Sequence, residues 1–102
     1  MMNTKQVEHG GKVYAVKKLS AVDRMKLADL GMNFDDDEVK ALAYLAASVS
    51  DVDGVPLKPI RTKADVYDRV DRLEPALSEI AEAFGELNGE SATAKDVEAA
   101  KN

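Results

Sequence analysis

Apolar and polar positions alternate in two short runs near the N-terminus of the chain. These runs, residues 5–9 and 12–18, are rich in Val, Tyr and Lys and are separated by Gly10 and Gly11. Two consecutive glycines reach positive φ without steric cost, as the tight turn of a hairpin requires. The pattern therefore predicts a β-hairpin at the start of the chain.

Four later positions combine a helix-capping residue with an acidic residue three positions further on. The capping oxygen satisfies a free backbone N–H of the first turn, and the acidic residue lies at the positive end of the helix dipole. Each pair therefore predicts the start of a helix. The pairs are Ser20 with Asp23, Asp35 with Glu38, Thr62 with Asp65, and Thr93 with Asp96.

The first two helices differ in the distribution of their charges. The first is predicted over residues 21–30, ends at Gly31 and is mixed in charge. The second is predicted over residues 36–50 and carries no charge after Lys40. A helix without a polar face is buried on most sides, so we expect the second helix at the centre of the fold.

The strongest helical periodicity lies in the last long segment, after a turn over residues 51–54 and an extended stretch over residues 55–60. Its apolar residues recur at alternating spacings of four and three on both sides of Pro75. Because proline disrupts a helix interior, we expect two helices or a kink, with Pro75 in a first turn. The stripe consists of Val66, Val70, Leu73, Leu77, Ile80, Phe84 and Leu87.

These elements predict an α+β fold that is mainly α: a small N-terminal β-hairpin followed by three to four helices. A length of 102 residues fits one domain, which we place over residues 1–89. Residues 90–102 are small, polar and rich in Ala, so we expect a flexible C-terminal tail.

Composition argues against several classes of function. Without Cys there is no thiol nucleophile and no thiolate metal site, and His9 is the sole histidine. A formal net charge of -5 acts against binding to a phosphate backbone, so no nucleic-acid partner is expected. The longest uncharged run, residues 41–50, is half the length of a membrane span, so no membrane partner is expected either.

Two acidic segments are weak candidates for metal binding. Capping and the helix dipole explain the run over residues 35–38. The segment Asp51–Gly54 resembles part of a calcium loop, but that alignment places Val49 and Ile60 where oxygen ligands are needed. The sequence therefore predicts no catalytic residue, no metal ligand and no cofactor, and we expect a protein that is not an enzyme.

The long apolar stripe leaves two interpretations open. It is either an ordinary core-facing helix surface or a face that binds apolar segments of another chain, which makes its seven residues candidate partner-binding residues. Residues 74–90, with five Glu and no basic residue, are either a solvated helix face or a surface that selects a basic partner. Large apolar side chains are few, so self-association into a homo-oligomer is a further expectation.

The order of these features resembles a known family. A basic N-terminal hairpin precedes residues 19–24 (LSAVDR), 41–49 (ALAYLAASV), 53–57 (DGVPL) and 86–89 (ELNG). In this arrangement, over about residues 5–89, the chain is similar to the small tail assembly chaperones of long-tailed bacteriophages and prophages. The resemblance identifies no catalytic residue.

The resemblance implies a helper protein in the host cytoplasm. Such a chaperone coats the long tape measure protein, keeps it soluble and yields to tail tube subunits as they polymerise. It also implies a short form and a frameshifted long form, and an A-rich slippery sequence would encode the ending Lys101-Asn102. The alternatives are a structural head–tail joining or tail-completion protein that stays in the virion, and an acidic inhibitor that mimics DNA.

Overall fold

The computed structural model describes residues 3–88, which form an α+β fold as predicted. The tail expected over residues 90–102 and the helix start expected at Thr93 lie outside these residues. The elements are β1 (Thr4–His9), β2 (Lys12–Lys17), α1 (Ala21–Ala28), α2 (Asp37–Ser48), β3 (Val49–Val52), β4 (Val55–Pro56), α3 (Lys63–Leu73), a 3-10 turn η1 (Glu74–Ala76) and α4 (Leu77–Leu87).

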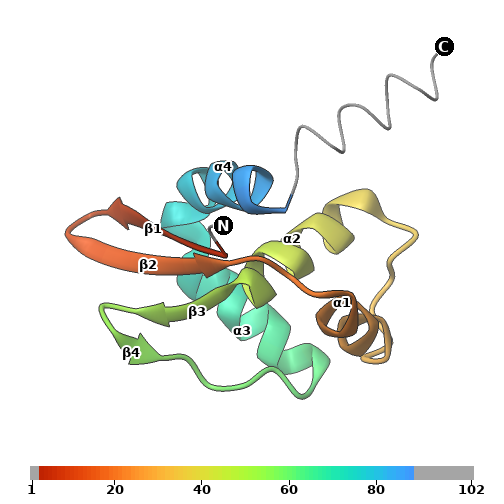
Figure 1. Cartoon of the computed structure of the whole chain (residues 1–102). Helices are drawn as coiled ribbons and strands as arrows, with labels where there is room; N and C mark the ends of the chain where they lie inside the picture. Colours follow the sequence, from red (N-terminus) through yellow and green to blue (C-terminus); the bar gives the residue numbers. More distant parts are fainter. Residues whose placement is uncertain (1–2, 89–102) are drawn as a thin grey trace, which may run out of the picture.

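The strands form one antiparallel sheet in the order β1-β2-β3-β4 (Figure 1). The predicted N-terminal hairpin is confirmed, and both residues of its turn, Gly10 and Gly11, have positive φ (58° and 80°). A second hairpin, β3–β4, was not predicted. It turns through Asp53 and Gly54, and the Asp53 carboxylate accepts a hydrogen bond of 2.8 Å from the backbone N–H of Val13 on β2.

The second helix is shorter than predicted, because α2 ends at Ser48 and the chain continues directly into β3. Val49, expected in the helix, is the first residue of this strand and is fully buried. Val is β-branched and packs well on a pleated surface, so contact with the sheet outweighs the helical pattern before it.

Two of the predicted capping boxes are present. The Ser20 hydroxyl accepts a hydrogen bond of 3.1 Å from the backbone N–H of Asp23, and Thr62 caps α3 in the same way. The start of α2 was predicted one residue too early. Asp36, not Asp35, is the N-cap of that helix, and its carboxylate accepts hydrogen bonds from two backbone N–H groups of the first turn.

The predicted break at Pro75 is confirmed. The chain leaves α3 at Leu73, makes the 3-10 turn that contains Pro75, and starts α4 at Leu77. Proline has no backbone N–H to donate and is tolerated in a first turn, so the break costs no interior helical hydrogen bond. The two halves of the stripe therefore lie on separate helices.

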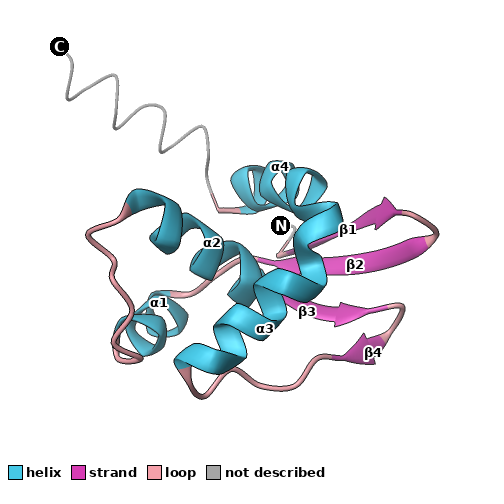
Figure 2. Cartoon of the chain, turned by 180° about the vertical axis from the view of Figure 1, so that it is seen from behind, coloured by secondary structure: helices cyan, strands magenta, loops and turns pink. Residues whose placement is uncertain are grey.

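Buried side chains form two clusters. The first lies between the sheet and the helices α3 and α4, and its members are Tyr14, Val16, Val49, Val52, Leu73, Ala76, Ile80, Ala83 and Leu87. The second joins α1, α2 and α3 through Leu27, Ala43, Ala46 and Val66. Figure 1 shows α3 behind the sheet, and Figure 2, the view from behind, shows it in front. The end of α3 and α4 thus pack on one face of the sheet.

Helix α2 packs against α1, α3 and α4, but it is not buried on most sides as expected. Ala43 and Ala46 have no exposed surface, whereas Leu42 and Leu45 are half-buried and Ala41 is exposed. One side of α2 therefore presents uncharged side chains to solvent.

Candidate functional site: the grooves beside α2

The apolar stripe separates into two rows. Val66, Leu73, Ile80 and Leu87, spaced by seven residues, are buried in the two clusters. Side chains that fill a core are not available to another chain, so we do not keep Leu73, Ile80 and Leu87 as candidate partner-binding residues. Val66 is 1% exposed and lies beneath one of the grooves described below. Helical periodicity marks a face of a helix, and it does not show how deeply each side chain of that face is covered.

The second row consists of Val70, Leu77 and Phe84, which are half-buried. They are also spaced by seven residues, and they lie on the flank of α3 and α4 that faces α2. Val70 and Leu77 line a groove between α2 and α3, and Phe84 lines another between α2 and α4. These three residues remain candidates for contact with a partner.

The groove between α2 and α3, called the α2–α3 groove below, encloses about 520 Å³. Its apolar lining combines residues of both helices with one residue of the loop before α2 and one at the start of α4. Tyr67 is 59% exposed and stands at its edge. The apolar lining residues are Met32, Val39, Leu42, Ala43, Val66, Tyr67, Val70 and Leu77.

Three charged residues line the α2–α3 groove, and all are acidic. Glu38 lies in the first turn of α2, whereas Asp71 and Glu74 lie at the end of α3, so both walls carry negative charge. All three side chains are exposed. The groove thus has an apolar floor and an acidic rim.

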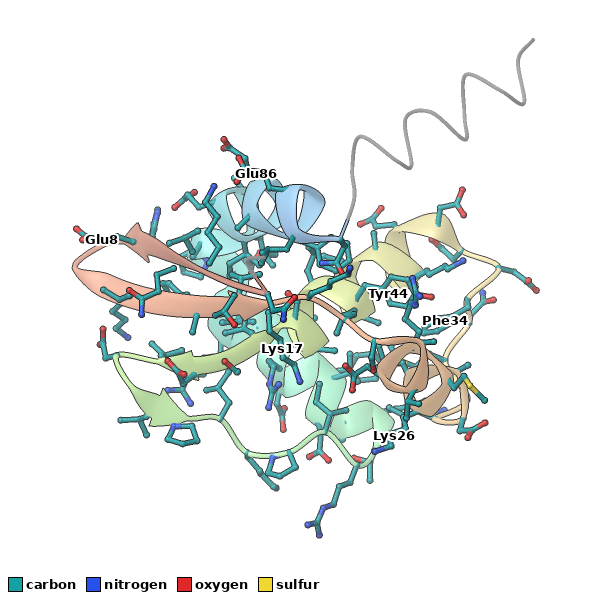
Figure 3. The ribbon with its side chains drawn as sticks, in the orientation of Figure 1. Glu8, Lys17, Lys26, Phe34, Tyr44 and Glu86 are labelled. Atoms are coloured by element: carbon teal, nitrogen blue, oxygen red, sulfur yellow. The ribbon has the colours of Figure 1, made fainter. Side chains whose placement is uncertain are left out.

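The groove between α2 and α4, called the α2–α4 groove, encloses about 360 Å³ and has one charge of each sign, Asp37 and Lys40. The Lys40 ammonium lies 5.8 Å from the centre of the Tyr44 ring. Phe34 and Tyr44 meet edge to face, with ring centres 5.9 Å apart (Figure 3). One acidic and one basic residue give this groove no net preference for a charged partner.

Sequence reasoning missed Arg69, which holds α3 to its neighbours. Its guanidinium group donates hydrogen bonds to the carbonyl oxygens of Ala46 (3.4 Å), Val49 (3.3 Å) and Lys58. Burial lowers the pKa of this guanidinium group, the nearby Arg72 lowers it further, and Asp65 raises it. No sequence signal distinguishes Arg69 from the other basic residues of α3.

Metal binding and membrane insertion find no support in the described part of the chain. Among residues 3–88, no three His, Asp or Glu side chains are placed to hold a metal ion together. Within the same residues, no helix has the length and apolar character needed to cross a membrane.

No protein-family model matches the chain, and no curated protein and no solved structure matches it. The two grooves beside α2 and the order of the sequence features are therefore the observations that bear on function.

Proposed function

We propose that this chain is a tail assembly chaperone of a long-tailed bacteriophage or prophage. In this proposal it acts in the host cytoplasm without catalysis, binds apolar helical segments of the tape measure protein, keeps that protein soluble and helps to recruit tail tube subunits. The order of the sequence features suggests the family, and the α2–α3 groove supports the proposal because it offers a surface for such segments.

An apolar groove between two helices is a common binding site for a third helix. Val39 and Leu42 line the α2 wall of the groove, and Val70 lines the α3 wall. Leu77, the first residue of α4, also lines the groove. A helix that inserts apolar side chains between these walls removes apolar surface of both partners from water. Such a contact is non-covalent, so the helix can bind and leave the groove without a chemical reaction.

The dimensions of the groove suit reversible binding. Its walls cover residues 38–43 on α2 and 66–74 on α3 and the start of η1, which corresponds to roughly 10 Å of helix, or about two turns. Contact over two turns buries far less surface than a stable interface of about 1,600 Å². A long client is therefore covered by many copies, each of which is released easily when tube subunits replace it.

Co-expression with the tape measure protein of the same phage tests the proposal. We expect the chain to raise the soluble fraction of the tape measure protein and to co-purify with it. Substitution of the exposed groove residue Tyr67→Ser should reduce both effects, since it removes an aromatic contact without opening the core.

A matched control is Val55→Ser, which changes a residue that is similarly exposed (63%) but lies on β4, outside both grooves. This variant should act like the parent chain. If the tape measure protein remains insoluble with the parent chain, the proposed function is wrong. Detection of the chain in purified virions by mass spectrometry would instead favour a structural joining or completion protein.

A further inference from the structure

We propose that the α2–α3 groove selects an amphipathic helix whose apolar face is flanked on both sides by Lys or Arg. This inference rests on the proposed function and specifies the chemical class of segment that the groove accepts. Its basis is the combination of an apolar floor with an acidic rim on both walls.

The rim charges stand on opposite walls of the groove. Glu38 belongs to α2, Asp71 belongs to α3, and Glu74 is the first residue of the turn η1 that follows α3. A helix that lies along the groove with its apolar stripe inward places its flanking residues beside both walls. Lys or Arg at those positions meets carboxylates, whereas Asp or Glu there is repelled.

The acidic rim is specific to this groove. The opposite flank of α3 lines a separate hollow of about 200 Å³ that contains Lys58, Arg69 and Arg72 together with two acidic residues. The α2–α4 groove carries one acidic and one basic residue. Of five hollows compared on the surface of residues 3–88, the α2–α3 groove is the one that combines a mainly apolar floor with charges of one sign.

A second copy of the chain is a poor occupant in a symmetric arrangement. In a two-fold dimer the same patch meets itself, which here would bring six carboxylates together across one apolar contact. Repulsion between these carboxylates opposes association, so the acidic rim disfavours a homodimer through this face. A basic amphipathic helix satisfies both the floor and the rim.

The test uses two fluorescently labelled synthetic peptides of about 14 residues, or about four helical turns. Both carry Leu at positions i, i+3, i+4 and i+7; one has Lys on both flanks of that stripe, and the other has Glu at the same flanking positions. We expect the purified chain to bind the Lys peptide about tenfold more tightly than the Glu peptide at low salt, because the three exposed carboxylates attract Lys and repel Glu at the flanking positions. Raising the salt from about 0.05 M to about 0.5 M should remove most of this preference.

Removal of the rim charges provides the decisive variant. The triple substitution Glu38→Gln, Asp71→Asn, Glu74→Gln should abolish both the preference for Lys and its salt dependence. A matched control, Glu8→Gln, Asp29→Asn, Glu82→Gln, removes the same number of exposed carboxylates away from the groove and should keep both. Thermal melts of the two variants confirm that each is folded before binding is compared.

Different outcomes separate this inference from the proposed function. Equal binding of the two peptides, or an equal loss of the preference for Lys in the two triple variants, would show that the rim does not select the helix. Neither result would contradict binding of the tape measure protein. If the chain forms a dimer that dissociates on Tyr67→Ser substitution, a second copy fills the groove. That result would also contradict the selection of a basic helix. Failure of the parent chain to solubilise the tape measure protein, with the peptide preference present, rejects the proposed function alone.

Discussion

Arg69 shows how one side chain joins three segments of this fold. Its guanidinium group reaches the end of α2 through Ala46, the first residue of β3 through Val49, and the segment before α3 through Lys58. A planar guanidinium group has five N–H donors spread over three nitrogen atoms and can bind several carbonyl groups at once. The three donors of an ammonium group all lie on one nitrogen atom, so it cannot reach the same carbonyl groups together. The forked shape of the Arg69 guanidinium group therefore allows it to bind three carbonyl groups.

We expect Arg69→Lys to lower the free energy of unfolding by about 2 kcal/mol, although the charge is kept, because two or more carbonyl groups lose their donors. Urea unfolding followed by circular dichroism measures this change. Arg72→Lys, the same substitution at an exposed position of α3, is the control and should cost less than about 0.5 kcal/mol. Equal midpoints for the two variants would show that Arg69 does not hold these segments together.

Asp65 makes the stability of α3 depend on pH. Its carboxylate accepts hydrogen bonds from the backbone N–H groups of Arg61 (2.9 Å) and Thr62 (3.0 Å), and these bonds lower its pKa below the ordinary value, the bond from Arg61 having the largest effect. A pKa lowered by folding means that the stabilisation is present above the unfolded pKa of about 3.9. It is lost as the pH falls through the lower pKa of the folded state.

We therefore expect Asp65→Asn to lower the melting temperature at neutral pH. The difference in melting temperature from the parent chain should shrink as the pH falls from about 5 to about 2. Thermal melts across this range measure the difference. The matched variant Asp68→Asn, on the same helix, should show a smaller difference at neutral pH. A difference for Asp65→Asn that stays constant with pH would contradict the role of its ionised carboxylate.

At the scale of elements, α2 has one buried side and one exposed side, and two alanines that are two positions apart in the sequence lie on these different sides. Ala43 packs in the second cluster with no exposed surface, and Ala41 is exposed beside the α2–α4 groove. Ala43→Asp places a carboxylate among apolar side chains and should cost several kcal/mol, enough to unfold a small domain. Ala41→Asp should leave the melting temperature within a few degrees of the parent.

Circular dichroism melts of the two Asp variants compare the two sides of α2 directly. The helix propensity lost is the same in both, and repulsion from Asp37 at position 41 costs only a few tenths of a kcal/mol, so the difference between the melts reports mainly burial. If both unfold, the open side of α2 is covered in solution by another surface of the protein or by a second copy.

The elements that were predicted correctly carry local chemical signals. Two glycines define the first hairpin, Ser20 and Thr62 cap their helices with nearby acids, and Pro75 separates α3 from α4. Each signal acts through neighbouring backbone groups, so the sequence alone is sufficient to recognise it.

The strand β3 and the grooves depend on packing between distant segments. Val49 lies in the uncharged run over residues 41–50, for which a helix was predicted, and its contact with the sheet decides that it starts a strand. Likewise, Val70 and Ile80 belong to the same stripe, yet one lines a groove and the other is buried in the core. Periodicity identifies apolar positions, but the depth of each depends on the neighbouring elements.

At the scale of the whole molecule, the two apolar clusters share their helices. Helix α3 contributes Val66 to the second cluster and Leu73 to the first, and both residues are almost fully buried. A helix that belongs to two clusters cannot leave one without disturbing the other. The clusters should therefore unfold together.

Leu73→Ala tests this coupling. We expect it to lower the free energy of unfolding by about 3 kcal/mol, in the range for a fully buried leucine, and to leave one transition. Far-UV circular dichroism and tyrosine fluorescence should give the same midpoint, since Tyr14 packs in the first cluster and Tyr44 against the second. Two separate midpoints would show that the clusters are independent folding units.

The direct junction between α2 and β3 limits where the length of this chain can change. Ser48 ends the helix and Val49 begins the strand, with no residue between them. Each residue turns a helix by about 100° and reverses the face of a strand, so one inserted residue either rotates α2 away from α3 or moves Val49 and Val52 to the wrong face of the sheet. An alanine inserted after Ser48 should abolish folding, whereas one inserted after Pro59, in the exposed connection to α3, should be tolerated. Homologous chains are accordingly expected to vary in length in that connection and to keep a constant count of residues across the junction.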